Sequence, residues 1–117
     1  MLCPGGNGGK EMDWAYLYMK NIPIESQYLY RKALDLSKLE NYETALRYFR
    51  QAVIIAPQYS KAFYEMGNCL VKLGQYYEAV VLYNRALAID PDCTDAQIKR
   101  DIIINNGVLN TTEQKKF

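Results

Sequence analysis

A unit of 34 residues occurs twice in succession in this chain of 117 residues, and this repeat constrains the fold more than any other feature. Pro23, Pro57 and Pro91 are each separated by 34 residues. A fixed period of this length is typical of solenoid proteins, in which each repeat packs against its neighbours. When residues 26–59 are aligned with residues 60–93, the identical pairs include Ser26/Ser60, Tyr30/Tyr64, Leu36/Leu70, Lys38/Lys72, Leu39/Leu73, Tyr42/Tyr76, Ala45/Ala79, Ala52/Ala86 and Pro57/Pro91.

Each unit contains two stripes of apolar residues at the spacing of an α-helix. Gly74 and Gln75 interrupt the pattern between the two stripes of the second unit. Pro91 ends the second stripe, because proline lacks the N–H group that a helix interior needs. The sequence therefore predicts a helix–turn–helix hairpin in each unit. In the second unit the stripes are Phe63, Met66, Gly67, Leu70 and Val71, and then Ala79, Leu82, Tyr83, Ala86 and Leu87.

Polar residues at the start of several stripes suggest where the helices begin. Ser60 and Asn41 are predicted N-caps, since their short side chains accept hydrogen bonds from free backbone N–H groups. Thr94 and Gln97 have the spacing of a capping box at the start of a last helix.

The repeated unit resembles the tetratricopeptide repeat, whose pattern is W-x2-L-G-x2-Y, then A-x3-F, then Ala and Pro. The second unit matches with Phe63, Met66, Gly67, Leu70, Ala79, Tyr83, Ala86 and Pro91. The first unit matches with Leu29, Ala33, Leu36, Ala45, Phe49, Ala52 and Pro57, and it departs at Lys32. The resemblance implies an all-α solenoid of helix–turn–helix repeats that binds other proteins.

The same register divides the rest of the chain. Residues 1–10 are expected to be a flexible N-terminal extension, and residues 11–106 to form the repeat domain. Within this domain, residues 11–20 form the second helix of a preceding half-repeat, followed by full repeats at 26–59 and 60–93. A capping helix of about residues 95–105 follows, with Gln97, Arg100 and Asp101 in the slots that would face a further helix. Residues 107–117 are expected to be a mobile tail.

The composition argues against several classes of function. The chain has no histidine, which removes Ser-His-Asp and Cys-His nucleophile systems and most zinc sites. We therefore expect no enzyme activity, no catalytic residue, no metal and no cofactor. Fourteen basic residues against thirteen acidic ones give no concentrated charge for nucleic acid or a membrane surface. Three cysteines at no metal-like spacing suggest reduced thiols and a cytoplasmic location.

The family resemblance also implies where a ligand binds, because ligands of such repeats usually lie in the concave groove lined by the first helices. Tyr30 and Tyr64 would grip an extended peptide by aromatic contact. The alternative is that these positions form an ordinary solvated face. The candidate groove residues are Gln27, Tyr30, Arg31, Leu34 and Lys38 in the first unit, Lys61, Tyr64, Glu65, Asn68 and Lys72 in the second, and Ile98 and Lys99 in the last helix.

Two functions follow from these expectations. The first is an adaptor or scaffold that binds a peptide or partner protein in the groove. The second is a structural unit that stacks repeats between chains. For the second function we expect a homodimer through the N-terminal helix, whose apolar residues Trp14, Leu17 and Tyr18 have no first helix to cover them.

Overall fold

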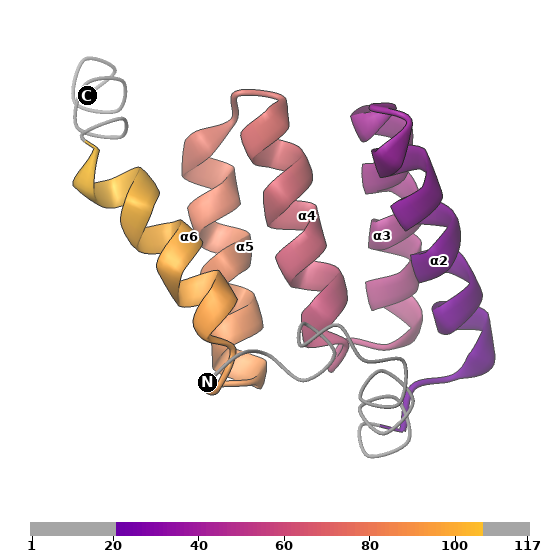
Figure 1. The fold of residues 1–117 in the computed structure, drawn as a ribbon. Helices are drawn as coiled ribbons and strands as arrows, with labels where there is room; N and C mark the ends of the chain where they lie inside the picture. Colours follow the sequence, from indigo (N-terminus) through magenta and orange to yellow (C-terminus); the bar gives the residue numbers. More distant parts are fainter. Residues whose placement is uncertain (1–20, 107–117) are drawn as a thin grey trace.

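The computed structural model describes residues 21–106, and all regular structure within that range is helical (Figure 1). The helices are α2 (Ile24–Lys38), α3 (Tyr42–Ile55), α4 (Ser60–Lys72), α5 (Tyr76–Ile89) and α6 (Thr94–Asn105). The prediction of an all-α helix–turn–helix solenoid is confirmed. The extension at residues 1–10, the half-repeat helix at 11–20 and the tail at 107–117 lie outside the described residues.

The helices form two successive hairpins and a final single helix. In Figure 1, α2, α4 and α6 lie on the near side of the molecule, with α3 and α5 behind them. α2 packs against α3, α4 packs against α5, and the hairpins join where α3 meets α4. α6 packs against α5 and continues the array at its C-terminal end. The first helix of every unit therefore lies on the same side of the molecule.

Small residues let the paired helices approach closely. Ala45, Ala52, Ala79 and Ala86 are all fully buried. A Cβ atom added at Gly67 would lie 2.6 Å from Cε1 of Tyr83, so the absence of a side chain makes room for that ring. Interiors are packed to crystal-like density, so a small residue at each of these positions leaves space for its neighbours.

None of the predicted N-cap side chains makes a capping hydrogen bond, and two of the three residues are not at the cap position. Tyr59 holds the N-cap position of α4 and Cys93 that of α6, so Ser60 and Thr94 are the first helical residues. Asn41 does hold the N-cap position of α3, but its side chain makes no capping hydrogen bond.

The serine that begins the first repeat acts across the hairpin instead. Ser26 is buried in α2 and donates a hydrogen bond from its Oγ to the carbonyl oxygen of Ala52, at 2.7 Å. The Ala52 carbonyl, in the last turn of α3, also accepts a hydrogen bond from the backbone N–H of Ala56 at 2.9 Å, so the Ser26 hydroxyl is its second donor. Ser26, near the start of α2, thus forms a hydrogen bond with the last turn of the adjacent helix α3.

The turn inside each hairpin has the same backbone conformation in both repeats. Glu40 has φ of 63° and Gly74 has φ of 80°, and these two residues occupy the same repeat position. In the first turn the N–H of Asn41 donates to the carbonyl of Leu36, at 2.9 Å. In the second the N–H of Gln75 donates to the carbonyl of Leu70, at 2.8 Å. Both helices therefore end in a Schellman motif, which favours glycine at the left-handed residue.

Replacing Glu40 with glycine is expected to stabilise the protein. A left-handed conformation raises the free energy of the folded state by about 1–2 kcal/mol for a residue with a side chain, and glycine avoids this strain. Glycine also loses more chain entropy on folding, which offsets about 0.5–1 kcal/mol of the gain. The net gain in the free energy of unfolding should be about 0.5–1 kcal/mol. Urea denaturation followed by circular dichroism measures it.

The matched control is Gly74→Glu in the second turn, which should lower the free energy of unfolding by a similar amount. A Cβ atom at Gly74 would meet nothing within 4 Å, so only the backbone conformation contributes to this change. A destabilising Glu40→Gly together with a neutral Gly74→Glu would contradict the explanation.

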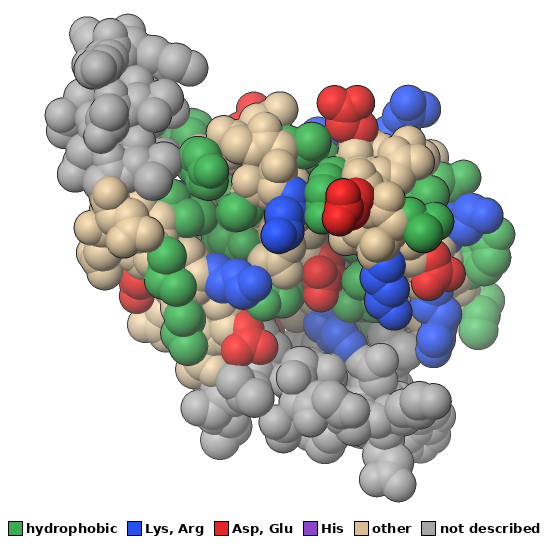
Figure 2. Space-filling model, turned by 45° about the horizontal axis from the view of Figure 1, so that its top comes forward, with side chains coloured by type: hydrophobic (Ala, Val, Ile, Leu, Met, Phe, Trp, Pro, Cys, Tyr) green, Lys and Arg blue, Asp and Glu red, His purple; other side chains and the backbone are tan. Residues whose placement is uncertain are grey.

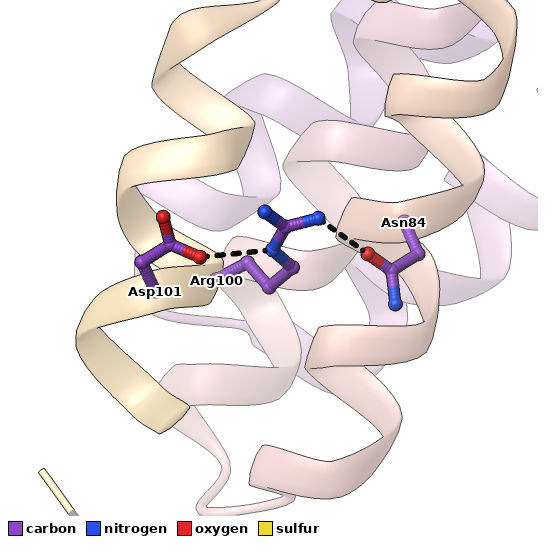
Figure 3. Close-up of polar contacts among 3 residues, drawn as sticks. All are labelled: Asn84, Arg100 and Asp101. Carbon is purple, nitrogen blue, oxygen red and sulfur yellow. Dashed lines mark hydrogen bonds and ion pairs between the residues drawn. The ribbon is translucent and has the colours of Figure 1, made fainter. Parts of the chain in front are cut away.

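The C-terminal end of the described solenoid is only partly polar. Arg100 of α6 donates from its Nη1 to Oδ1 of Asn84 on α5, at 3.0 Å, and its Nε lies 3.1 Å from Oδ1 of Asp101 (Figure 3). The hydrogen bond to Asn84 joins α6 to α5, and the contact with Asp101 lies within α6. Ile104, however, is exposed at the position that Leu70 buries in α4. Gln97 is exposed and Arg100 reaches back to α5, so the polar outer face of the capping helix stays a prediction, and the apolar Ile104 adjoins these residues.

Candidate functional site

Contacts between lysine and tyrosine side chains join α2, α4 and α6, the three helices on the near side of Figure 1. Nζ of Lys61, on α4, lies 5.7 Å from the centroid of the Tyr30 ring on α2. Nζ of Lys99, on α6, lies 5.8 Å from the centroid of the Tyr64 ring on α4. Both distances are within the range of a cation–π interaction. Each groove tyrosine is therefore covered by a lysine from the next first helix.

The two tyrosines differ in how much of the ring is available. Tyr30 is only 7% exposed and packs against Phe49 and Tyr59, with ring centroids 5.7 and 4.9 Å apart. Tyr64 is half-buried, and its ring centroid lies 5.9 Å from that of Tyr83. Tyr30 is mainly a core residue, so Tyr64 offers more surface to a ligand.

A hydrogen-bonded chain runs from the core to two of the candidate groove residues. The hydroxyl of Tyr83, on α5, donates to Oδ1 of Asn68 at 2.6 Å. Nδ2 of Asn68 donates to Oε1 of Glu65 at 3.3 Å. Tyr83 thus orients two groove residues, although the sequence analysis assigned it only to the core. The sequence does contain a signal for this role of Tyr83. Two aligned positions change together between the repeats, from the apolar pair Leu34 and Phe49 to the hydrogen-bonding pair Asn68 and Tyr83.

Burial changes the titration of the charged groups in the centre of this surface. Burial raises the pKa of Glu65, while the Asn68 hydrogen bond and the charges of Lys99 and Lys61 oppose that rise. Burial lowers the pKa of Lys61 to about 8, and the Glu65 carboxylate opposes this change. Both groups have lost part of their hydration, and each keeps an opposite charge nearby.

A pocket of about 270 Å³ opens between α4, α5 and α6. Most of its wall is apolar, and the amide of Asn68 and the hydroxyl-bearing ring of Tyr83 contribute at one side. The lining residues are Asn68, Val71, Lys72, Tyr83, Lys99, Ile102 and Ile103.

The remaining candidate residues occupy varied positions. Nε2 of Gln27 donates to the carbonyl oxygen of Ile22 at 2.9 Å, so its amide is engaged at the start of α2. Leu34 is partly buried and packs against the core. The other candidates, which are Arg31, Lys38, Lys72, Ile98 and Lys99, are exposed.

The cysteines differ from the sequence expectation. Cys69 is a free, buried thiol, and burial raises its pKa to about 11. Cys93 is disulfide-bonded, so the prediction of three reduced thiols is wrong for this residue. The inference of a cytoplasmic location loses that support. Within residues 21–106, no cluster of three or more potential ligands for a metal ion is present. No helix in that range is long and apolar enough to span a lipid bilayer.

Comparison with known proteins agrees with this arrangement. The family model of the tetratricopeptide repeat matches residues 26–59 and again residues 60–93. An uncharacterized protein of Methanocaldococcus jannaschii is 30% identical over 77 residues, which cover 66% of this chain and 90% of that protein.

Two fungal proteins are also similar to this chain. The small glutamine-rich tetratricopeptide repeat-containing protein 2 of Mycosarcoma maydis is 31% identical over 71 residues. The protein of the same name from Saccharomyces cerevisiae is 28% identical over 83 residues. These matches cover 61% and 71% of this chain but only 19% and 24% of the two fungal proteins.

Proposed function

The chain belongs to the tetratricopeptide-repeat family, and from this premise we propose that it is a protein-interaction module whose groove binds an extended peptide segment of a partner. The proposed groove is the side of α2, α4 and α6 that carries the candidate residues named above. The observation that carries the proposal is the row of Tyr30, Lys61, Tyr64 and Lys99, which continues across all three helices. In this proposal the chain acts as an adaptor or scaffold and performs no catalysis.

The chemistry of the row suits a peptide. The half-buried ring of Tyr64 provides rigid contact area, and aromatic residues of this kind often dominate binding energy. The Asn68 amide lies beside it, and an amide can both donate to and accept from a peptide backbone. Tyr83 and Glu65 hold this amide in place, which lowers the cost of ordering it on binding.

Replacing Tyr64 with alanine should weaken the binding of a peptide at least tenfold, because the groove loses its principal exposed ring. The peptide is obtained by selection from a random display library on the intact chain, and its affinity is measured by calorimetry. The control is Tyr77→Ala, which removes a 53% exposed tyrosine from α5, outside the groove. Thermal unfolding of both variants verifies that they are folded.

The position of the bound peptide is then mapped by NMR chemical-shift changes. Changes concentrated on α2, α4 and α6 are the expected result. Changes concentrated on the outer faces of α3 and α5, or equal losses of affinity in the two tyrosine variants, would overturn the groove proposal.

The second candidate function is self-assembly, and one observation favours it. Ile24 is 73% exposed and Tyr28 is 62% exposed on α2, whereas Ala62, at the position of Tyr28 in the second repeat, is fully buried. The start of the described solenoid therefore presents apolar surface. The proposed contact is a homodimer through Trp14, Leu17 and Tyr18, which lie outside the described residues.

Sedimentation of the intact chain over a concentration series tests self-assembly. A dimer that the Trp14→Glu variant disrupts is the expected result for this second candidate. A chain that stays monomeric near millimolar concentration leaves only groove binding.

A further inference from the structure

The solvent-facing side of α5 differs from that of α3, although the two helices have the same place in the repeat. Tyr77 is 53% exposed and Val81 is 42% exposed. At the position of Val81, in the middle of this side, α3 has the exposed Arg47. The outer face of α5 is therefore apolar at its centre, where that of α3 is charged. The exposed residues of α5 lie at helical spacing along this outer face and are Tyr77, Glu78, Val81, Asn84, Arg85 and Ala88.

Two opposite charges border the apolar centre of the outer face. Glu78 and Arg85 are both exposed and lie seven residues apart, so they are on the same side of the helix two turns from each other. The guanidinium carbon of Arg85 lies 5.6 Å from the centroid of the Phe63 ring on α4, within the range of a cation–π interaction. This contact holds Arg85 at the edge of the outer face. Single exposed apolar residues are ordinary, so the pattern of charges around them decides whether the face fits a partner.

The outer face of α5 is complementary to itself. If a two-fold axis passes between Val81 and Leu82, two copies of α5 run antiparallel and Glu78 of one copy lies level with Arg85 of the other. The reverse pair forms as well, because a two-fold axis repeats every contact. Val81 then lies beside Val81 of the second copy. Tyr77 lies within about 3 Å, along the helix axis, of the small Ala88 of the second copy, so the helices can approach closely.

The outer face of α3 has no such complementarity. In the same arrangement Arg47 would meet Arg47 of the second copy at the axis. Thr44 and Gln51 have the positions of Glu78 and Arg85, so no opposite charges would meet. Complementary charges across an interface fix its register, whereas like charges in contact disfavour it. Of the two repeats, only the second therefore fits a copy of itself.

We infer that the outer face of α5 is an interface with a second copy of this chain, formed by two antiparallel α5 helices. The apolar residues Tyr77, Val81 and Ala88 form its centre, and two Glu78–Arg85 pairs flank them. The 14 residues of α5 span about 21 Å, so the contact is small and its dissociation constant is on the order of 0.1 mM. This interface uses a different surface from the dimer through residues 11–20, and it does not depend on the proposed groove.

The dimer leaves the first helices of both copies accessible. In Figure 1 α5 lies behind α4 and α6, so a copy packed on its outer face does not cover the near side. The side that stays open carries basic and acidic side chains among hydrophobic ones (Figure 2). Two chains joined in this way present two such sides, and a partner with two binding segments gains affinity from the linkage.

The test is sedimentation equilibrium of the intact chain and of the variants Glu78→Arg and Arg85→Glu over a concentration series. Each variant alone should dimerise about tenfold more weakly or worse, because like charges then meet at both ends of the interface. An equimolar mixture of the two variants should recover the dimer, since the mixed pair brings opposite charges together at both ends. Such recovery requires the antiparallel register and cannot arise from a change in folding.

Three further variants test the position of the interface. Val81→Arg, which introduces the residue type of the first repeat, should weaken the dimer at least tenfold. Glu43→Arg and Arg47→Glu make the same charge changes at exposed residues of α3, and as matched controls they should leave dimerisation unchanged. Circular dichroism verifies that every variant is folded.

Several results would overturn the inference. One is a chain that stays monomeric near millimolar concentration. Another is a dimer that Trp14→Glu disrupts and Val81→Arg leaves intact, and a third is a mixture of the two charge variants that stays monomeric. A monomer in which NMR shows contacts between Val81 and residues 107–117 would assign the outer face to the chain's own C-terminal segment and exclude the dimer. Peptide binding in the groove is measured separately, so its failure would leave this interface in place.

Discussion

Replacing Tyr83 with alanine will lower the free energy of unfolding by about 3–5 kcal/mol, the range for truncating a large aromatic core residue. Its side chain is fully buried in α5, packs over Gly67 of α4 and lies against the Tyr64 ring. A domain of this kind is stable by about 5–15 kcal/mol, so a large part of that stability is lost. Urea denaturation followed by circular dichroism at 20 °C or below provides the measurement.

The variant Tyr83→Phe separates the ring from the hydroxyl. The first repeat has Phe49 at the same position, so a phenyl ring fits this packing arrangement. Only the hydrogen bond to Asn68 is lost, which should cost about 1 kcal/mol. Equal losses in the alanine and phenylalanine variants would contradict the claim that the ring carries most of the stabilisation.

Enlarging Ala79 or Ala86 to leucine is expected to cost about 1–3 kcal/mol in each variant, because both side chains of α5 are fully buried and have no space to expand. Differential scanning calorimetry should show a fall in the melting temperature of about 5 °C or more. Ala88→Leu is the matched control, since Ala88 is exposed on the same helix and should change the melting temperature little. Unchanged melting temperatures for Ala79→Leu and Ala86→Leu would mean that the helix pairing is wrong.

The hairpins were predictable because their signals are local and repeated. Pro57 and Pro91 mark the ends of α3 and α5, and Gly74 marks the turn between α4 and α5. Ala45, Ala52, Ala79 and Ala86 recur at the interval that places them between paired helices, and all four are buried. Helix ends, turns and small buried positions depend on the conformation or size of single residues. The same residue types at the same positions of both repeats support each of these assignments.

The N-caps were predicted less well, and the exposure of the candidate groove tyrosines could not be predicted, because both depend on neighbouring helices. Ser60 is the first residue of its helix rather than the cap before it, and Ser26 bonds to a carbonyl on the adjacent helix. Tyr30 and Tyr64 are identical in the alignment, yet one is in the core and the other is half-exposed. Nothing within a single repeat distinguishes them.

The sequence by itself determined the all-α class, the 34-residue period, the two hairpins and the positions of the small residues, because each follows from spacing along the chain. Only the tertiary structure decided the hydrogen-bonded chain of Tyr83, Asn68 and Glu65, the lysine–tyrosine contacts and the pocket beside α6. It also decided that Cys93 is disulfide-bonded. These features depend on distances between side chains of different helices, and such distances arise only once the helices have packed.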